Sequence, residues 1–355
     1  MRLFRKFSQA DNERIANTLY QWQFQQLGID GLTLDLDSTV MTRYGTQEGT
    51  ARGYNPSKPG RVSHHPLMAF VADTRMIANC WLRPGNTASA NNVSAFLDST
   101  LTNLAGKRIG LLRADSGFSD NANAFLCKLE EQKTSHIIAL RLNQPLQRAL
   151  VDAQGWWEID DGIDLVSVQY QAPSWPHPRT VVGIRQHVNK RVNPKGKTLS
   201  LFVDDPAIGQ YRFGALVTDT TLPAQVVWRT YRGRADCENR IKELKYDFAA
   251  DSFCLKEFWA TEASLTMVML AYNFMSLFRQ VALRHSLISG GKDVQHTLNT
   301  LRLKLFAKAG YIGTEGRKDV LRLAVAMRQR QWFEGVWDKS KSFDLPVTFS
   351  PVFTP

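Results

Sequence analysis

The sequence predicts an α/β protein with a mixed sheet flanked by helices and a β-rich insertion. Strand-like and helix-like segments alternate from residue 31 to residue 142, an order that is typical of α/β proteins. Residues 143–222 interrupt this pattern with short β-like runs, several prolines and no convincing helix. Residues 223–290 are strongly helical again. The β-rich segment therefore lies between two α/β-patterned regions, as an insertion would.

The first elements of the chain follow from hydrophobic periodicity. One amphipathic helix is expected within residues 1–30. Residues 31–37 alternate leucine with polar side chains, which predicts a half-buried strand with Asp35 and Asp37 on one face. The next elements are expected to be a long loop at 42–64, a hairpin of strands at 66–73 and 76–83, a helix at 88–104, a strand at 108–115, a helix at 119–132 and a strand at 136–142.

The C-terminal part adds a long apolar stretch and a basic tail. Residues 263–278 are interrupted by polar side chains and are fewer than the roughly 20 that span a bilayer, so they predict a buried core helix. A strand is expected at 320–324. The patterns divide the chain into a short N-terminal helical segment (1–30), the first part of a core (31–142), a β-rich insertion (143–222), the helical second part of the core (223–290) and a C-terminal region (291–355).

Charge and cysteine content restrict the functional classes. The 355 residues include 44 Lys and Arg against 33 Asp and Glu, a formal charge of +11, which suggests a polyanionic partner. With 43% hydrophobic and 22% charged residues, the composition is globular and excludes a disordered, collagen-like or coiled-coil chain. Four cysteines without C-x-x-C spacing indicate neither a disulfide framework nor a zinc site.

The segment YRGRADCENRIKELK carries the most specific chemical signal, and it contains Tyr231, Arg234, Glu238 and Lys245. Their offsets of 0, 3, 7 and 14 place all four within an arc of about 60° on a helix. A carboxylate between two cations suits a metal ion and a phosphodiester, because the carboxylate ligates Mg²⁺ and the cations neutralise phosphate oxygens. The alternative is a solvated helix with an Arg234–Glu238 pair, which is the commoner outcome for such a charge run alone.

Two further carboxylates favour the metal-site interpretation. Asp37 and Asp115 each end a predicted central strand and are followed by small or hydroxyl residues. With Glu238 they supply the three carboxylates of a two-Mg²⁺ phosphoryl-transfer site, because hard cations prefer oxygen ligands. Asp35 shares the strand face of Asp37 and is the alternative to it, although we expect Asp35 to be a supporting or edge residue.

The segments LDLDST, YGTQEGTARGYNP and LLRADSGF, with the Y-x2-R-x3-E-x6-K pattern, resemble a DDE transposase of bacterial insertion sequences. The resemblance is to the group with this signature and a β-strand insertion, and it covers roughly residues 30–285. It implies an RNase H-like catalytic core in which Asp37, Asp115 and Glu238 hold two Mg²⁺ ions, with Mn²⁺ as a substitute. By the same resemblance Arg234 and Lys245 bind phosphates of the transposon end, and Tyr231 orients one of them.

The resemblance also implies a reaction and partners. The expected reaction is cleavage of double-stranded DNA at transposon ends, followed by strand transfer into target DNA. The chain is expected to form a homodimer on DNA through residues 291–355, to need no membrane and to work in the bacterial cytoplasm at the nucleoid. An insertion aromatic stacks on a flipped base in relatives. The candidates are Trp156, Trp157 and Trp175, although packing is the commoner role of such tryptophans.

Two expectations concern the N-terminus and the histidines. Only about 30 residues precede Leu32, whereas family members usually carry a sizeable N-terminal DNA-binding region, so the sequence predicts a truncated form. A catalytically silent DNA-binding remnant that regulates a full-length transposase is therefore one alternative function. An RNase H-like nuclease is the other. The histidines, including His64 and His65, lack metal-ligand spacing and are expected in loops or on the surface.

Overall fold

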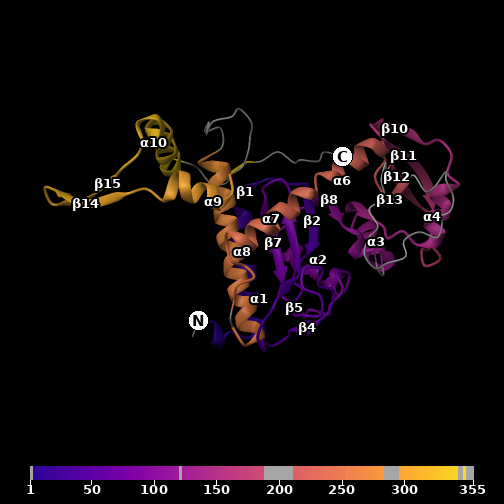
Figure 1. Cartoon of the computed structure of the whole chain (residues 1–355), viewed down its shortest axis with the longest axis horizontal. Coiled ribbons are helices and arrows are strands. Elements are labelled where there is room, and N and C mark those ends of the chain that lie inside the picture. The colour runs from indigo at the N-terminus through magenta and orange to yellow at the C-terminus, as the bar shows by residue number, and fades with distance from the viewer. Residues whose placement is uncertain are drawn as a thin grey trace.

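A nine-stranded mixed sheet is the centre of the part of the chain that the structure describes (Figure 1). The computed structural model describes residues 3–119, 122–187, 211–253, 255–283, 296–342 and 347–348. Five strands from the N-terminal region lie in the spatial order β7 (Met76–Trp81), β6 (Leu67–Val71), β2 (Leu32–Ser38), β8 (Ile109–Ala114) and β9 (Ser135–Ala139). The strands β2, β8 and β9 are parallel, whereas β6 and β7 are antiparallel to their neighbours. The predicted mixed sheet and the predicted hairpin are confirmed.

The strand β2 is buried on both faces, so the prediction of a half-buried strand is wrong. Its leucines are fully buried, and Asp35 and Asp37 on the other face are only 1% and 7% exposed. Two arginines cover that polar face. They are Arg113 from β8 and Arg234, which precedes helix α7 (Ala235–Tyr246). Alternating polarity here reflects buried ion pairs and not a solvated face.

Three helices, α1 (Gln9–Gln25), α2 (Val93–Asn103) and α8 (Phe258–Val281), pack on one another or on β7. Asn273 of α8 accepts from the backbone N–H of Ile77 in β7 at 2.6 Å and donates to its carbonyl at 2.8 Å. These bonds occupy an edge that would otherwise offer unpaired backbone groups to another strand. The predicted N-terminal helix and core helix are confirmed as α1 and α8. None of the described helices is long and apolar enough to cross a membrane.

The inserted strands continue the central sheet instead of forming a sheet of their own. Beyond β9 the order is β13 (Tyr211–Thr218), β12 (Arg179–His187), β11 (Ile163–Tyr170) and β10 (Trp157–Asp160), all antiparallel to their neighbours. Helix α6 (Ala224–Arg232) packs on this part through Val227 and Trp228, which share a core with Leu111 and Ile137 of β8 and β9. The insertion and the N-terminal strands therefore have a common hydrophobic core. Residues 188–210 of the insertion lie outside the described residues.

Three predictions for local structure need correction. Helix α4 (Gln144–Val151) lies in the segment expected to lack helices; Asn143 caps it and Leu146 and Leu150 are buried. The expected loop at 42–64 contains a small sheet of β3 (Met41–Thr42), β4 (Ala51–Arg52) and β5 (Val62–His64). The helix expected at 88–104 begins only at Val93, after Asn92 in the left-handed conformation.

The helix expected at 119–132 is α3 (Ala122–Glu131), which follows a 3-10 turn, η2 (Ser116–Phe118).

The C-terminal region extends away from the body of the molecule (Figure 1). Helix α9 (Leu298–Leu301) continues into a π-helical turn, η3 (Arg302–Phe306), and a hairpin of β14 (Gly310–Glu315) and β15 (Lys318–Leu323) follows. This hairpin confirms the strand expected at 320–324. The remaining described elements are α10 (Met327–Lys341), the 3-10 turn η1 (Phe4–Lys6) and the parallel pair of β1 (Leu27–Gly28) with β16 (Val347–Thr348).

Candidate active site

Two predicted site carboxylates lie at the ends of neighbouring parallel strands. Asp37 is the sixth residue of β2, and Asp115 directly follows β8. Parallel strands end at the same edge of a sheet, so the pairing of β2 with β8 brings the two side chains together. Asp37 accepts a hydrogen bond from the backbone N–H of Ser38 at 2.8 Å, and Asp115 accepts one from that of Gly117 at 2.9 Å. Both carboxylates are thus held by their own turns.

Arg234 lies between these carboxylates. Its Nη2 is 3.2 Å from Asp37 Oδ1 and 3.9 Å from Asp115 Oδ2, and it donates to the carbonyl of Leu36 at 3.1 Å. Only 6% of Arg234 is exposed. The expectation that this side chain binds DNA phosphates stays a prediction. In the folded chain it provides the positive charge between two acidic groups.

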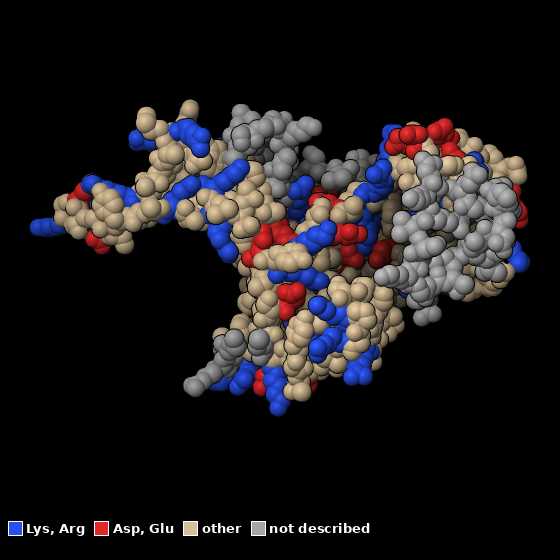
Figure 2. Space-filling model, viewed as in Figure 1, with Lys and Arg blue, Asp and Glu red and all other residues tan. Residues whose placement is uncertain are grey.

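The third predicted carboxylate, Glu238, stands on the exposed side of α7. Burial raises the pKa of Asp37 to about 6, the Arg234 charge opposes this rise, and the charges of Asp115 and Glu238 add to it. The three carboxylates therefore lie within electrostatic reach of one another. Acidic side chains gather over α7 and the neighbouring strand ends, with Lys and Arg close by (Figure 2).

Asp35, the alternative to Asp37, is already fully engaged. Arg113 donates from Nε and Nη2 to its two carboxylate oxygens, at 2.6 and 2.8 Å, and the side chains are 3% and 1% exposed. A bidentate buried pair of this kind leaves little carboxylate capacity for a metal ion. The geometry therefore favours Asp37 as the candidate ligand on β2.

The signature residues do not lie on one continuous helix, so that prediction is wrong. Tyr231 belongs to α6, whereas Arg234 occupies the N-cap position of α7, without a side-chain capping bond, after a turn at Gly233. Arg113 Nη1 donates to the carbonyl of Thr230 at 2.5 Å, and the Arg234 N–H bonds Tyr231 O instead. A side chain on Gly233 would come within 2.9 Å of Arg113 Nη1. The buried arginine therefore takes the carbonyl that an α-helix would use, which breaks the helix.

The other two signature side chains flank the acidic group. Tyr231 is half-buried, and burial raises its pKa against the opposing charge of Arg234. Lys245 on α7 donates to the carbonyl of Val40 at 2.8 Å, three residues beyond Asp37. Burial lowers the pKa of Lys245, and the charge of Asp251 opposes this. The charges of Asp37 and Asp115 act on the Tyr231 phenol, and the charge of Asp37 acts on Lys245.

The carboxylate oxygens of this site are candidate ligands for a divalent metal ion. Within the described residues, no three or more His, Cys, Asp or Glu side chains are grouped closely enough to hold one. Asp37 and Asp115 do hold a cation between them, the Arg234 guanidinium, which shows that this position favours positive charge. Their oxygen atoms are the donors that Mg²⁺ and Mn²⁺ prefer. The chemistry of this pair therefore fits such an ion, provided that it replaces Arg234.

The two adjacent histidines are buried and do not lie on the surface; His64 belongs to β5, whereas His65 lies in the loop between β5 and β6, as expected. His64 accepts at Nδ1 from Arg43 Nε at 3.1 Å and its Nε2 bonds the Glu48 carbonyl at 2.9 Å. His65 bonds the Thr87 carbonyl through Nδ1 at 2.7 Å. Their hydrogen bonds hold the small sheet and the adjacent loops together beside the site.

His64 makes stability depend on pH. Burial lowers its pKa from 6.5 to about 4, the bond to the Glu48 carbonyl opposes this and the charge of Arg43 adds to it. Between these pH values the unfolded chain binds a proton that the folded chain does not. The stability from neutral His64 is therefore present above pH 6.5 and is lost toward pH 4, by about 3 kcal/mol.

The measurement is urea unfolding of wild type and His64→Gln across this pH range. Glutamine keeps one donor and one acceptor but does not titrate, so the pH dependence should shrink by most of that amount. Equal slopes in the two proteins would contradict the assignment. Other titrating groups are common to both proteins and cancel in the difference.

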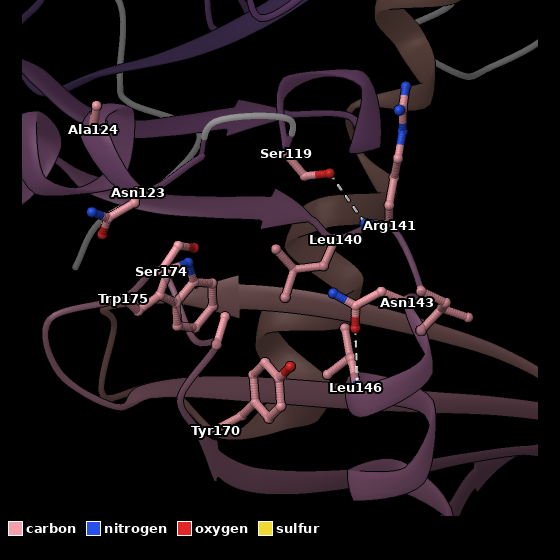
Figure 3. Close-up of a pocket in the computed structure, with 12 residues that line it drawn as sticks. Ser119, Asn123, Ala124, Leu140, Arg141, Asn143, Leu146, Tyr170, Ser174 and Trp175 are labelled. Atoms are coloured by element: carbon pink, nitrogen blue, oxygen red, sulfur yellow. Dashed lines mark hydrogen bonds between the residues drawn. The ribbon is translucent and has the colours of Figure 1, made fainter.

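A pocket of about 790 Å³ lies between the first core strands and the insertion (Figure 3). Tyr170 and Trp175 lie on its insertion side, and Ser119, four residues beyond Asp115, accepts at Oγ from the backbone N–H of Arg141 at 3.2 Å. Tyr170 and Arg141 were not identified from the sequence, because nothing in their local pattern separates them from ordinary strand and loop residues.

The three insertion tryptophans have different surroundings. Trp175 is 7% exposed and packs against Arg179 and Tyr170. Trp156 is covered by the Arg185 guanidinium at 4.7 Å. Trp157 is 40% exposed. Of these three, Trp175 lines the pocket of Figure 3.

The mixed sheet with acidic side chains at its parallel strand ends defines the class: the chain is a DDE transposase family protein. In particular, it belongs to the family described as transposase DDE domain group 1, whose model matches residues 1–342. Members of this family generally use divalent metal ions. The predicted family resemblance is thereby confirmed.

A cryo-EM structure described as the piggyBac transposase synaptic complex with hairpin DNA matches with a TM-score of 0.38 and 14% identity. The match covers 87% of this chain, and the chain spans 58% of the length of that structure. No curated protein matches the chain.

Proposed function

We propose that this chain is a metal-dependent DNA transposase that cleaves transposon ends and transfers the freed strand into target DNA. The observation that supports it most directly is the pair of carboxylates, Asp37 and Asp115, at adjacent parallel strand ends around one buried cation. Glu238 on α7 adds the third acidic group. The family membership supplies the reaction class, and the +11 charge suits a polyanionic substrate.

The proposed reaction has two phosphoryl-transfer steps. In the first, water attacks the phosphorus at the transposon end, the bond to the 3′ oxygen breaks and that oxygen leaves as a 3′-hydroxyl. In the second, this hydroxyl attacks a target phosphate and a second 3′ oxygen leaves. Asp37, Asp115 and Glu238 would hold two Mg²⁺ ions, or Mn²⁺. Such ions supply Lewis-acid activation of the attacking and leaving oxygens.

The remaining signature residues take separate roles in this proposal. Lys245 neutralises a phosphate oxygen beside the cleaved bond, and Tyr231 fixes the orientation of that phosphate through its hydroxyl. Arg234 keeps Asp37 and Asp115 paired until DNA and metal arrive, and is then free to turn toward a phosphate. Arg234 is assigned a different role from Lys245 because its side chain is buried.

The partners follow from the same proposal. The substrate is double-stranded DNA, both transposon ends and target, so the chain works at the bacterial nucleoid. A homodimer pairs the two ends, and the projecting region from α9 to α10 is the surface proposed for it. The pocket of Figure 3 is proposed to receive an unpaired base against Trp175 and Tyr170.

The test is a cleavage assay with the element's own flanking DNA. The purified chain should nick a labelled end fragment in Mg²⁺ or Mn²⁺ but not in EDTA, and should join the freed strand to a plasmid. Cleavage without joining would support the nuclease alternative. Binding without cleavage would support the silent remnant. Asp37→Ala, Asp115→Ala or Glu238→Ala variants that cut as fast as wild type would overturn the proposal.

Arg234 gives a second prediction that needs no catalysis. Arg234→Gln leaves Asp37 and Asp115 without their cation, so the metal-free chain should lose about 3–5 kcal/mol of unfolding free energy. Added Mn²⁺ should then stabilise this variant more than wild type, because the metal no longer competes with the guanidinium. Thermal unfolding with and without Mn²⁺ measures both effects.

The matched control for that prediction is Arg185→Gln, which breaks an ion pair with Asp164 on the inserted strands, away from the carboxylates. Its response to Mn²⁺ should equal that of wild type. An Arg234→Gln variant with an unchanged Mn²⁺ response would show that Arg234 does not occupy the metal position.

A further inference from the structure

A second groove, of about 800 Å³, opens beside Lys245 and Thr42 of the small sheet. One wall is the segment from Val40 to Gln47, which follows Asp37 directly, and the other is the connection between α7 and α8. The groove is lined by residues 44–47, which open the YGTQEGTARGYNP segment, and by the signature Lys245, and the roles expected for these motifs do not include such a groove. It adjoins the candidate active site, because Lys245 and Val40 both line it and are joined by a hydrogen bond.

The two walls are held together by hydrogen bonds. Gln47 donates from Nε2 to the Phe253 carbonyl at 2.8 Å, and the Glu48 N–H donates to the Lys256 carbonyl at 2.8 Å. Arg43 also bonds the Asp251 carbonyl across the groove floor. The groove is therefore part of the folded structure, with a fixed spacing between its walls.

Exposed aromatic and basic side chains line this groove, and the Arg61 guanidinium lies over one face of the Tyr44 ring, 5.7 Å from its centre. Tyr44 is 73% exposed and Tyr246 is 83% exposed, and both line the same groove. Lys58 and Lys256 are exposed beside them. Asp251 is the acidic side chain among the lining residues, so positive charge predominates.

This combination has a specific chemical use. Exposed aromatic rings interleaved with lysines bind single-stranded nucleic acid, because bases stack on the rings while the ammonium groups neutralise phosphates. A duplex would present its phosphates but keep its bases stacked inside. Two large, solvent-exposed tyrosine rings in one basic groove therefore favour unpaired nucleotides over a duplex.

We infer that this groove binds unpaired nucleotides of the DNA strand adjoining the cleaved phosphate, with bases on Tyr44 and Tyr246 and phosphates on Lys58 and Lys256. The inference rests on the proposed function, since it takes the scissile phosphate to lie at the carboxylates. The groove and the pocket of Figure 3 have no lining residue in common, so they serve separate stretches of strand.

The test measures binding of the full chain to a fluorescein-labelled oligo-dT strand by anisotropy, in EDTA. Wild type should bind this strand more tightly than a duplex of equal length. Tyr44→Ala and Tyr246→Ala should each weaken single-strand binding about tenfold, in line with the usual contribution of one stacked base. Tyr→Phe at either position should keep the affinity, because phenylalanine retains the stacking face.

Two further measurements complete the test. Tyr311→Ala removes another exposed ring, 59% accessible, from the distant hairpin and should leave binding unchanged. Lys58→Ala with Lys256→Ala should reduce the slope of log affinity against log salt by about 0.7 per lysine. Absence of oligo-dT binding by wild type, or Ala variants at positions 44 and 246 that bind like Tyr311→Ala, would overturn the inference.

This binding test is separate from the proposed function. It is done without metal and needs no cleavage. If the chain cleaves DNA but binds oligo-dT equally with and without Tyr44 and Tyr246, the inferred role of the groove is refuted and the transposase proposal is not. A chain that binds through these tyrosines but never cleaves in Mg²⁺ or Mn²⁺ refutes the transposase reaction alone.

Discussion

Asp37→Asn should lower metal-dependent cleavage on the order of a thousandfold, while the metal-free chain stays folded. The amide has nearly the same shape and still accepts from the Ser38 N–H, but it removes the negative charge that a divalent ion requires. Burial disfavours the Asp37 charge, but its removal leaves the buried Arg234 without its nearer counter-charge, so part of the unfolding free energy should be lost as well. Single-turnover cleavage and urea unfolding, measured on the same preparation, separate these effects.

A change of ligand chemistry tests the same position further. Asp37→Cys should be inactive in Mg²⁺ and regain part of its activity in Mn²⁺, since a thiolate is a softer ligand. Asp161→Asn, at an exposed turn of the insertion, is the matched control and should cut like wild type. If Asp37→Asn kept full activity, the candidate site on β2 would be wrong.

Arg113→Ala should lower the unfolding free energy by about 3–5 kcal/mol, because it leaves the Asp35 carboxylate buried without its partner. It also frees the carbonyl of Thr230, so the turn between α6 and α7 should lose its anchor. The chain should therefore lose cleavage activity as well, although Arg113 does not contact the proposed substrate. Denaturant unfolding and the end-cleavage assay measure the two losses.

The control for that prediction lies close by in the sequence. Arg108 pairs with Asp30 at 3.4 Å, but the two side chains are 76% and 61% exposed. Arg108→Ala should therefore cost at most about 1 kcal/mol and leave cleavage unchanged. A double variant with Asp35→Leu and Arg113→Met should recover most of the lost stability, because it leaves no unpaired charge in the core. Equal losses for Arg113→Ala and Arg108→Ala would contradict this account.

Much of the fold could be predicted from local patterns. The strand at 31–37, the hairpin after it and the core helix α8 follow from hydrophobic periodicity, which neighbouring residues alone determine. Helix α4 was missed because Pro145 and the flanking β-like runs obscured its capping residue and its two buried leucines. The small sheet at 42–64 was missed because its strands are only two or three residues long.

The candidate site, like the fold, could be predicted from the sequence only in part. The spacing of the carboxylates and the Y-x2-R-x3-E-x6-K pattern pointed to a DDE transposase, and the family match confirms that membership. The roles assigned to individual residues stay predictions. The helix break at Gly233 could not be read from the signature, because its cause is Arg113, more than a hundred residues earlier.

By itself, the sequence determined the mixed α/β class, the family and the candidate acidic residues, because these depend on periodicity and motif spacing along the chain. Only the tertiary structure decided which partners those residues have. Arg234 bonds Leu36 across 198 residues and Arg113 pairs with Asp35 across 78. A buried charged side chain needs a counter-charge within reach. The arrangement of strands and helices in the fold determines which counter-charge that is. The position of Arg234 between Asp37 and Asp115 is therefore a consequence of the fold.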